Sequence, residues 1–525
     1  MATPHLLAID LGTSGPKVAL FTSSGDWVDA DFEPVALQLG EGGAAEQSPD
    51  EWWRAVTVAA QRLKQRQSLA MSQVVGVGCT AQWSGTVPID EAGHPLGNAI
   101  IWMDTRGASQ VKRQVRGFPS LLGYGALKLA KWVRLTGGAP GFSGKDSLAH
   151  ILFLKAERPE VYARTRYFLE PKDYLNLRLS GAVHASYDSI VLHWVTDNRN
   201  PSAVSYSPSL MRLAGLSGEQ LPSLRRATDV IGQVKPDVAA ALGIPESAKV
   251  VCGTPDVHSA ALGSGAVADF TPHLYLGTSS WLTCHVPFKK TDALHNMATI
   301  VSPMPGRYLI GNEQECAGAC LTFLRDNVFF SDDGLGTGRA PDDVFQRFDQ
   351  LAAAIPAGAG KVLFTPWLYG ERTPIEDPWI RGGFHNVSLD TPRGALVRAV
   401  LEGVAFNARW LLQTVEKFAG RPMPFVHIIG GGAKSPLWCE IQANVLGRTV
   451  NQVSRPMYAN ARGAAMLTAV GLGLGTFQDW ASRCPIERVF EPDSKHQALY
   501  SDLFGEFVRL YQSHRAIHRR LNQAP

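Results

Sequence analysis

A short apolar run that ends in a Gly-Thr-Ser turn occurs twice in this chain, and this recurrence constrains the fold more than any other sequence feature. The first copy, LLAIDLGTS at residues 6–14, is followed by a second apolar run over 18–21. The other copy, LYLGTSS, occupies residues 274–280. Each copy predicts a strand, a Gly-containing turn and a returning strand. One such unit near the start of each half favours two related folds that face one cleft.

The segments around these turns predict alternating strands and helices. Four further apolar runs predict buried strands, at 74–79, 98–102, 250–253 and 425–429. Helical spacing and start signals, among them Ser48 and Pro49, predict helices over 50–67, 258–262 and 436–446. This alternation is typical of α/β architecture. Because a single core stops growing at roughly 250–300 residues, we expect two domains in this 525-residue chain, 1–263 and 264–525.

Composition and charge exclude several classes of protein. With 45% hydrophobic and 18% charged residues, the chain reads as a well-packed globular protein. A net charge of +3 predicts neither a nucleic-acid surface nor a membrane-binding face. No apolar run approaches the roughly 20 residues that cross a bilayer, and the N-terminus lacks signal-peptide features. We therefore expect a cytoplasmic protein that binds neither nucleic acid nor membranes. The sequence is compatible with a homodimer.

The seven cysteines are scattered without a CxxC pair. Two of them, Cys316 and Cys320, could share a helix face, but two thiols without further His or Cys partners make a poor metal site. Free cysteines are usually buried. We therefore expect reduced, mostly buried thiols.

The first turn combines a carboxylate with groups that bind phosphate. Gly12 lets the backbone approach a ligand closely, and Thr13 and Ser14 supply hydroxyls beside the backbone N–H groups. Asp10 is a candidate magnesium ligand, because Mg²⁺ takes one or two carboxylates and keeps several waters. Lys17 would pair with a phosphate or lie in solvent. Taken alone, this turn is equally consistent with an ordinary hairpin.

Two turns in the second half strengthen the phosphate interpretation. Independent hairpins have no reason to share the strand-to-Gly-Thr-Ser form, whereas a nucleotide clamped between two domains needs a phosphate-binding turn from each. The strand at 425–429 ends in three glycines, which would let a flat base or ribose lie against the backbone. The ATP-binding residues expected from this half are Gly277, Thr278, Ser279, Gly431, Gly432, Ala433 and Lys434.

The full set of motifs resembles the FGGY family of carbohydrate kinases, and most closely its xylulokinase-like members. In order they are DLGTS at 10–14, QWSG at 82–85, WMDTR at 102–106, LGTS at 276–279, GERTP at 370–374 and IGGGAKS at 429–435. The resemblance implies two actin-like (ribonuclease H-like) α/β domains flanking a central cleft, with sugar held mainly by the first and ATP by the second. It also implies a kinase that uses ATP and Mg²⁺ to phosphorylate a hydroxyl of a small sugar or polyol.

By this resemblance, Asp256 occupies the position of the family's catalytic base. A carboxylate beside the acceptor hydroxyl can orient it and accept its proton. The alternative interpretation is structural, because Asp is also a favoured residue for capping the start of a helix.

The expected sugar pocket departs from the xylulokinase pattern. Where those proteins read Gln-Met-His-Gly, this chain has Gln82, Trp83, Ser84 and Gly85, so a hydrogen-bonding ring is lost and a large apolar face is gained. Trp83 and Trp102 could form a wall against the sugar, unless Trp102 is simply a core residue. The segment 144–146, GKD, looks like an insertion. The expected substrate-binding residues are Gln82, Trp83, Ser84, Trp102, Asp104, Arg106 and Asp256.

Two other classes of function use a similar fold. An actin-like ATPase would lack the QWSG, WMDTR and GERTP motifs that this chain carries. An inactive sugar or nucleotide sensor would not need Asp10, Asp256 and both Gly-Thr-Ser turns, which are all present. Release of ADP without sugar would favour the ATPase, and no release at all would favour the sensor.

The changed pocket predicts a changed substrate preference. We expect D-xylulose to have a lower kcat/KM than another polyol or ketose of similar length, and Trp83→Met with Ser84→His to shift the ratio towards D-xylulose. An apolar wall discriminates only by shape, by about 1–3 kcal/mol per methylene-sized change, whereas a hydrogen-bonding group penalises a mismatched ligand more strongly. A coupled assay of both proteins over a substrate panel measures the ratio, and a wild type that prefers D-xylulose over every other substrate would refute the interpretation.

Overall fold

The first half of the chain is built on a six-stranded sheet. The computed structural model describes residues 3–333 and 338–523. The strands of this sheet, in spatial order, are β16 (Val230–Gln233), β17 (Lys249–Val251), β6 (Val74–Ala81), β1 (His5–Gly12), β2 (Gly15–Thr22) and β3 (Trp27–Phe32). The three central strands β17, β6 and β1 are parallel, and β1 and β2 form the predicted hairpin.

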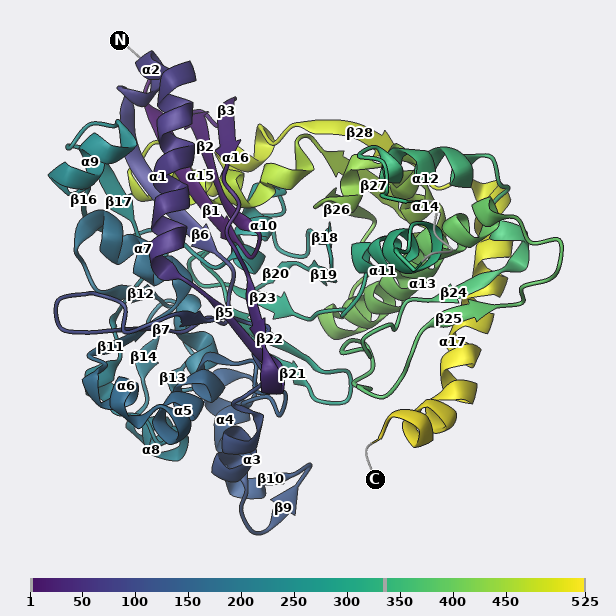
Figure 1. The fold of residues 1–525 in the computed structure, drawn as a ribbon, viewed down its shortest axis with the longest axis horizontal. Coiled ribbons are helices and arrows are strands. Elements are labelled where there is room, and N and C mark those ends of the chain that lie inside the picture. The colour runs from purple at the N-terminus through teal and green to yellow at the C-terminus, as the bar shows by residue number, and fades with distance from the viewer. Residues whose placement is uncertain (1–2, 334–337, 524–525) are drawn as a thin grey trace.

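The second half repeats this arrangement in a five-stranded sheet. Its order is β19 (Ser280–Thr283), β18 (His273–Leu276), β26 (Phe425–Ile429), β27 (Thr449–Val453) and β28 (Ile486–Phe490). Here β18, β26 and β27 are parallel, and β18 and β19 form an antiparallel hairpin. Each half therefore places a hairpin beside two parallel strands, in agreement with the α/β fold predicted from the two turns (Figure 1).

Sequence signals account for the main helices of both sheets. Helix α1 (Pro49–Arg66) begins where predicted, because the Ser48 side chain accepts a hydrogen bond from the Glu51 backbone N–H. Helix α14 (Pro436–Leu446) begins in the same way, with the Ser435 side chain accepting from the Trp438 backbone. Both use Pro in the first turn, where no N–H is needed. The other long helices are α4 (Ala126–Thr136), α5 (Ser147–Glu157), α7 (Pro171–Ser180), α12 (Val344–Ala353), α13 (Arg393–Ala419) and α17 (Ser494–Asn522).

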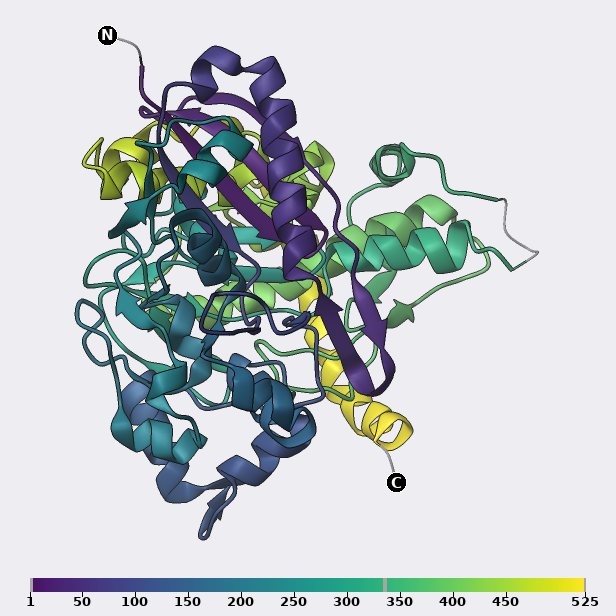
Figure 2. The ribbon, with the colours of Figure 1, turned by 60° about the vertical axis from the view of Figure 1, so that its left-hand side comes forward.

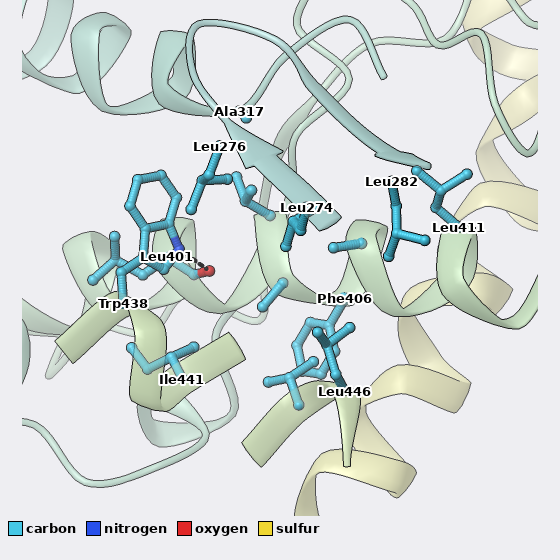
Figure 3. Close-up of a cluster of buried hydrophobic side chains, with 14 of the residues drawn as sticks. Leu274, Leu276, Leu282, Ala317, Leu401, Phe406, Leu411, Trp438, Ile441 and Leu446 are labelled. Atoms are coloured by element: carbon cyan, nitrogen blue, oxygen red, sulfur yellow. Dashed lines mark hydrogen bonds between the residues drawn. The ribbon is translucent and has the colours of Figure 1, made fainter. Parts of the chain in front are cut away.

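The largest core lies between the second sheet and helices α13 and α14. Figure 3 shows Leu274, Leu276 and Leu282 of β18 and β19 in one cluster with Leu401 and Phe406 of α13 and Ile441 of α14. At the edge of this cluster the Trp438 indole N–H donates to the Leu401 carbonyl at 3.0 Å. The same helix pair thus supports the ends of β18 and β26, which carry the glycine turns.

Two helices join the halves by packing across them. Helix α10 (Asp256–Gly263) follows β17 of the first sheet, yet its Ala260 packs with residues of the second sheet. Helix α15 (Ala459–Gly471) follows β27 of the second sheet, yet its alanines pack against Leu6 and Ala8 of β1. Figures 1 and 2 both place α15 beside the first sheet. Both helices therefore lie between the two sheets and contact residues of each.

Glycines permit the close contact of α10 with α15. A Cβ atom on Gly263 would lie 1.7 Å from the Ala459 carbonyl oxygen, and one on Gly463 would lie 2.0 Å from the Ser259 carbonyl oxygen. A glycine also allows α15 to pack closely on β6, because a Cβ on Gly78 would lie 2.0 Å from the Thr468 hydroxyl. No larger residue fits at these crossings without backbone movement.

Some details differ from expectation. The strand expected over 98–102 is reduced to β8 (Ala99–Ile100), because the chain turns at Trp102. All seven cysteines are free and all but Cys484 are buried, as predicted. Within residues 3–333 and 338–523, no helix combines the length and apolar character needed to cross a membrane.

The α10–α15 contact generates a stability prediction. Gly463→Ala should destabilise the protein by roughly 1–3 kcal/mol, since overpacking forces side chains or backbone to move. Gly505→Ala is the matched control: it lies in α17 with no atom within 4 Å of a new Cβ, and removing a helix-interior glycine should stabilise by roughly 0.5–1 kcal/mol. Denaturant unfolding measures both, and an unchanged Gly463→Ala midpoint would contradict the close packing.

Candidate active site

Three of the predicted site residues lie at one edge of the first sheet. Asp10 is near the carboxyl end of β1, Gln82 directly follows β6, and Asp256 follows β17 and opens α10. These strands are parallel neighbours, so their carboxyl ends meet. The carboxyl edge of a parallel sheet is where ligands of open α/β folds bind.

Asp10 and Lys17 form a pair across the first hairpin. They occupy opposed positions in β1 and β2, and the Lys17 ammonium lies 3.1 Å from the Asp10 carboxylate. Asp10 is 1% exposed and Lys17 is half-buried. The Asp10 charge raises the pKa of Lys17 against the opposing effect of burial. Lys17 is therefore not a solvated surface lysine.

Asp256 is the first residue of α10 rather than its cap. The capping position is Pro255, and the Asp256 carboxylate accepts a hydrogen bond only from the adjacent Val257 N–H, at 2.8 Å, within the described residues. Burial, and then the negative charge of Asp10, raise the pKa of Asp256 to about 7. A carboxyl group that titrates near neutral pH is suited to general-base catalysis, and this environment distinguishes it from a structural cap.

Tyr275, in β18 of the second sheet, lies near the carboxylates of Asp10 and Asp256. Burial raises the pKa of the Tyr275 phenol, and the charges of Asp256 and Asp10 raise it further. Its ring stacks on Trp281 at 3.9 Å between centroids. A Cβ on Gly277 would lie 2.2 Å from the Tyr275 ring, so only glycine fits there. The turn that begins at Gly277 therefore lies on the same side of the molecule as Asp10 and Asp256.

The predicted nucleotide-binding turns of the second half adjoin each other. They follow β18 and β26, which are parallel neighbours. Gly430 has a φ of +93°, and a Cβ there would lie 2.7 Å from the Leu276 carbonyl oxygen. Gly432–Lys434 forms a short 3₁₀ helix, with Lys434 and Gly431 exposed. The backbone of Ala317 and Gly318 donates to the Thr278 and Gly277 carbonyls, which fixes the first of these turns.

Thr13, Gln82 and Trp102 brace one another on the first sheet. The Thr13 hydroxyl donates to the Gln82 amide oxygen at 3.1 Å and accepts from the Trp102 indole N–H at 3.0 Å. The Gln82 amide in turn donates to Gln47 at 2.7 Å. Trp102 is half-buried, so it is not a closed core residue. These contacts fix the Trp102 ring beside the first turn, whose outermost residue, Ser14, is exposed.

Asp104 and Arg106 already have protein partners. The Asp104 carboxylate accepts from the Ala45 backbone and from the Arg106 guanidinium, both at 2.9 Å. Arg106 also pairs with Glu46 and lies 4.4 Å above the Phe153 ring. This network holds the chain between β8 and α5 in place, so these residues contribute at least a positioning role.

The two residues that depart from the xylulokinase pattern also have partners. The Trp83 indole N–H donates to the Ser189 carbonyl at 3.0 Å, and its ring meets His258 of α10 edge-on at 5.0 Å. Ser84 has a φ of +63°, and its hydroxyl donates to the Lys145 carbonyl at 2.6 Å. Trp83 and Ser84 therefore connect the expected sugar pocket to α10 and to the loop that contains Lys145.

Sequence reasoning missed a charged cluster contributed by both halves. Arg372 pairs with Glu313 and Glu315, and the half-buried Lys145 lies nearby. Burial raises the pKa of the neighbouring Glu371 to about 8, although it accepts from Asn407. The GERTP motif marks Glu371 and Arg372, and the apparent insertion at 144–146 contains Lys145, but no pattern marks Glu313 or Glu315. Within the described ranges, no three His, Cys, Asp or Glu side chains group as a metal site.

The raised pKa of Asp256 predicts a pH-dependent stability difference. Because the folded state binds this proton more tightly than an ordinary carboxyl does, the ionised group destabilises the fold increasingly from about pH 4 to about pH 7, and by a constant amount above. Asp256→Asn should therefore be more stable than wild type at pH 8 and differ little near pH 4. Thermal unfolding across this range measures the difference, with the exposed Asp502→Asn as control. A difference that does not grow with pH would contradict the assignment.

Comparisons with known proteins agree with this geometry. The xylulose kinase of Staphylococcus epidermidis (strain ATCC 12228 / FDA PCI 1200) is 27% identical over 98% of this chain and 97% of its own length. The xylulose kinase of Bacillus subtilis (strain 168) is 28% identical over 97% of this chain and 96% of its own. The crystal structure of a kinase from Brucella ovis, described as a xyloylose kinase, has the same fold, with a TM-score of 0.85, 24% identity, and coverage of 98% of this chain and 100% of that one.

Family models describe both halves. The N-terminal domain model of the FGGY family of carbohydrate kinases matches residues 5–263, and its C-terminal domain model matches residues 274–472. The matched ranges contain Asp10, Asp256 and the three glycine turns. This chain belongs to the FGGY family of carbohydrate kinases.

Proposed function

We propose that this protein transfers the γ-phosphoryl group of ATP to a hydroxyl of a small sugar or polyol, in a xylulokinase-like reaction. The observation that carries the proposal is the position of Asp256. It is a carboxyl group with a pKa of about 7, beside the Asp10–Lys17 pair of one sheet and Tyr275 of the other. Family membership supports the reaction class, and the names of the relatives support a sugar acceptor.

In this reaction Asp256 accepts the proton of the acceptor hydroxyl. The hydroxyl oxygen forms a new bond to the γ-phosphorus while the bond to ADP breaks. Phosphoryl transfer depends mainly on alignment and on neutralising charge, so the base contributes orientation as well as proton transfer. A pKa near 7 leaves a large share of Asp256 ionised at neutral pH, ready to accept that proton.

Asp10 is suited to hold Mg²⁺ bound to the phosphates of ATP. Its carboxylate is buried at the sheet edge, and its side-chain partner in the described residues is Lys17. One carboxylate, phosphate oxygens and waters are the set that Mg²⁺ prefers. The ion would neutralise phosphate charge, and Lys17 would then be released to contact a phosphate itself.

The two halves divide the substrates in this proposal. Residues 1–263 hold the sugar through Trp83, Ser84 and Trp102, and residues 264–525 hold ATP against the turns at 277–279 and 431–434. Helix α15 belongs to the second half by sequence but packs on the first sheet. The proposed boundary at residue 263 therefore separates the two halves in sequence, while their hydrophobic cores share this helix.

Asp256→Asn tests the reaction. Loss of a general base should lower kcat by roughly 10²–10⁴, while sugar binding measured by calorimetry stays close to wild type because the side chain keeps its shape. Coupled ADP release with and without a panel of ketoses, alditols, hexoses and aldonates measures turnover. A near-normal kcat would exclude Asp256 as the base. Sugar-independent ADP release would instead indicate an ATPase. No ADP release with any sugar would indicate a sensor.

A further inference from the structure

A half-buried lysine that forms no salt bridge within the described residues lies between the two halves. Lys145 precedes α5, and its ammonium nitrogen lies 5.9 Å from the Trp102 ring centre of the first half and 5.5 Å from the Tyr369 ring centre of the second. Across residues 3–333 and 338–523, this nitrogen has no carboxylate within 4.0 Å and donates no hydrogen bond. The ammonium is flanked by the faces of these two rings.

The carboxylates around Lys145 are occupied by other groups. Glu313 and Glu315 are both paired with Arg372. The Asp146 carboxylate accepts from the Gly141 backbone at 2.7 Å and from the Trp194 indole at 2.8 Å. Burial, followed by the positive charge of Arg372, lowers the pKa of Lys145. The protein therefore holds an ammonium where its charge is poorly compensated.

Contacts tie this lysine to the proposed sugar pocket. Ser84 donates to the Lys145 carbonyl, so the residue that stands in place of the xylulokinase histidine fixes the loop that carries the cation. The neighbouring Trp102 is bonded to Thr13 of the first turn. Through Trp102 and Thr13, Lys145 therefore lies on the side of the first sheet where β1 ends, and Asp256 follows the parallel strand β17 of the same sheet.

We propose that Lys145 determines specificity by binding the carboxylate of a sugar acid whose distal hydroxyl is phosphorylated at Asp256. This inference rests on the proposed kinase function and names its substrate class. An ammonium offers three donors and no acceptor, and its hydrogen bonds to a carboxylate are roughly twice as strong as bonds between neutral groups. A neutral ketose or alditol would leave the buried charge uncompensated.

The test compares acids with neutral sugars of equal length. The wild type should have a higher kcat/KM for D-gluconate or D-xylonate than for the alditols D-glucitol and xylitol and for D-xylulose. Lys145→Met should lower kcat/KM for the acids by roughly 10- to 100-fold, the value of one hydrogen bond to a charged group, and leave the neutral sugars and the KM for ATP unchanged. Lys131→Met, at an exposed position of α4, is the matched control and should change none of these.

Equal losses for acids and neutral sugars, or a raised KM for ATP, would overturn the inference. Calorimetric binding of D-gluconate and D-xylonate without ATP tests it independently of turnover. If Lys145→Met binds the acids more weakly and Lys131→Met does not, the inference is supported even when no substrate is phosphorylated. Absence of phosphorylation would refute only the kinase proposal. The inference is refuted if the acids bind neither the wild type nor Lys145→Met, or bind both equally. The kinase proposal still stands in that case if neutral sugars are phosphorylated. Thermal unfolding of each variant confirms that it folds.

Discussion

The contact between α10 and α15 is the constraint on which the rest of the structure depends. Each helix follows a strand of one sheet and also packs against the other sheet, and the two helices meet where Gly263 and Gly463 lack side chains. A close-packed crossing transmits small displacements, because a protein interior has little free volume. Since α10 begins with Asp256, this crossing also sets the position of the candidate base relative to both sheets.

Electrostatic interactions at the sheet edge follow from that placement. Asp256 lies near Asp10, whose negative charge opposes the ionisation of Asp256. Lys17 offsets part of this repulsion through its pair with Asp10. A cation that takes over the role of Lys17 at Asp10 would favour the ionised form of Asp256. Binding of the metal–nucleotide and activation of the base are therefore coupled in the proposed reaction.

Charged residues of the two halves also lie near each other. Arg372 and its two glutamates belong to the second half, and Lys145 belongs to a loop of the first. The approach of Lys145 to Tyr369 of the second half requires the halves to be close together, whereas Thr13, Gln82 and Trp102 bond to one another wholly within the first half. The site thus combines a rigid wall with a charged contact between halves, and only the latter depends on how the halves are placed.

The sequence by itself determined the elements and the chemistry of the turns. Strand periodicity, Ser-Pro starts and glycines reflect local backbone preferences, so β1, β2, α1 and α14 were predictable, as was the family from its motif order. Tertiary structure decided what has no local signal: the packing of α10 and α15 between the two sheets, the burial that raises the pKa of Asp256, the pairing of Arg106 with Glu46, and the position of Lys145 between two rings. Packing and charge act through space between residues far apart in the chain, and no local pattern records those distances.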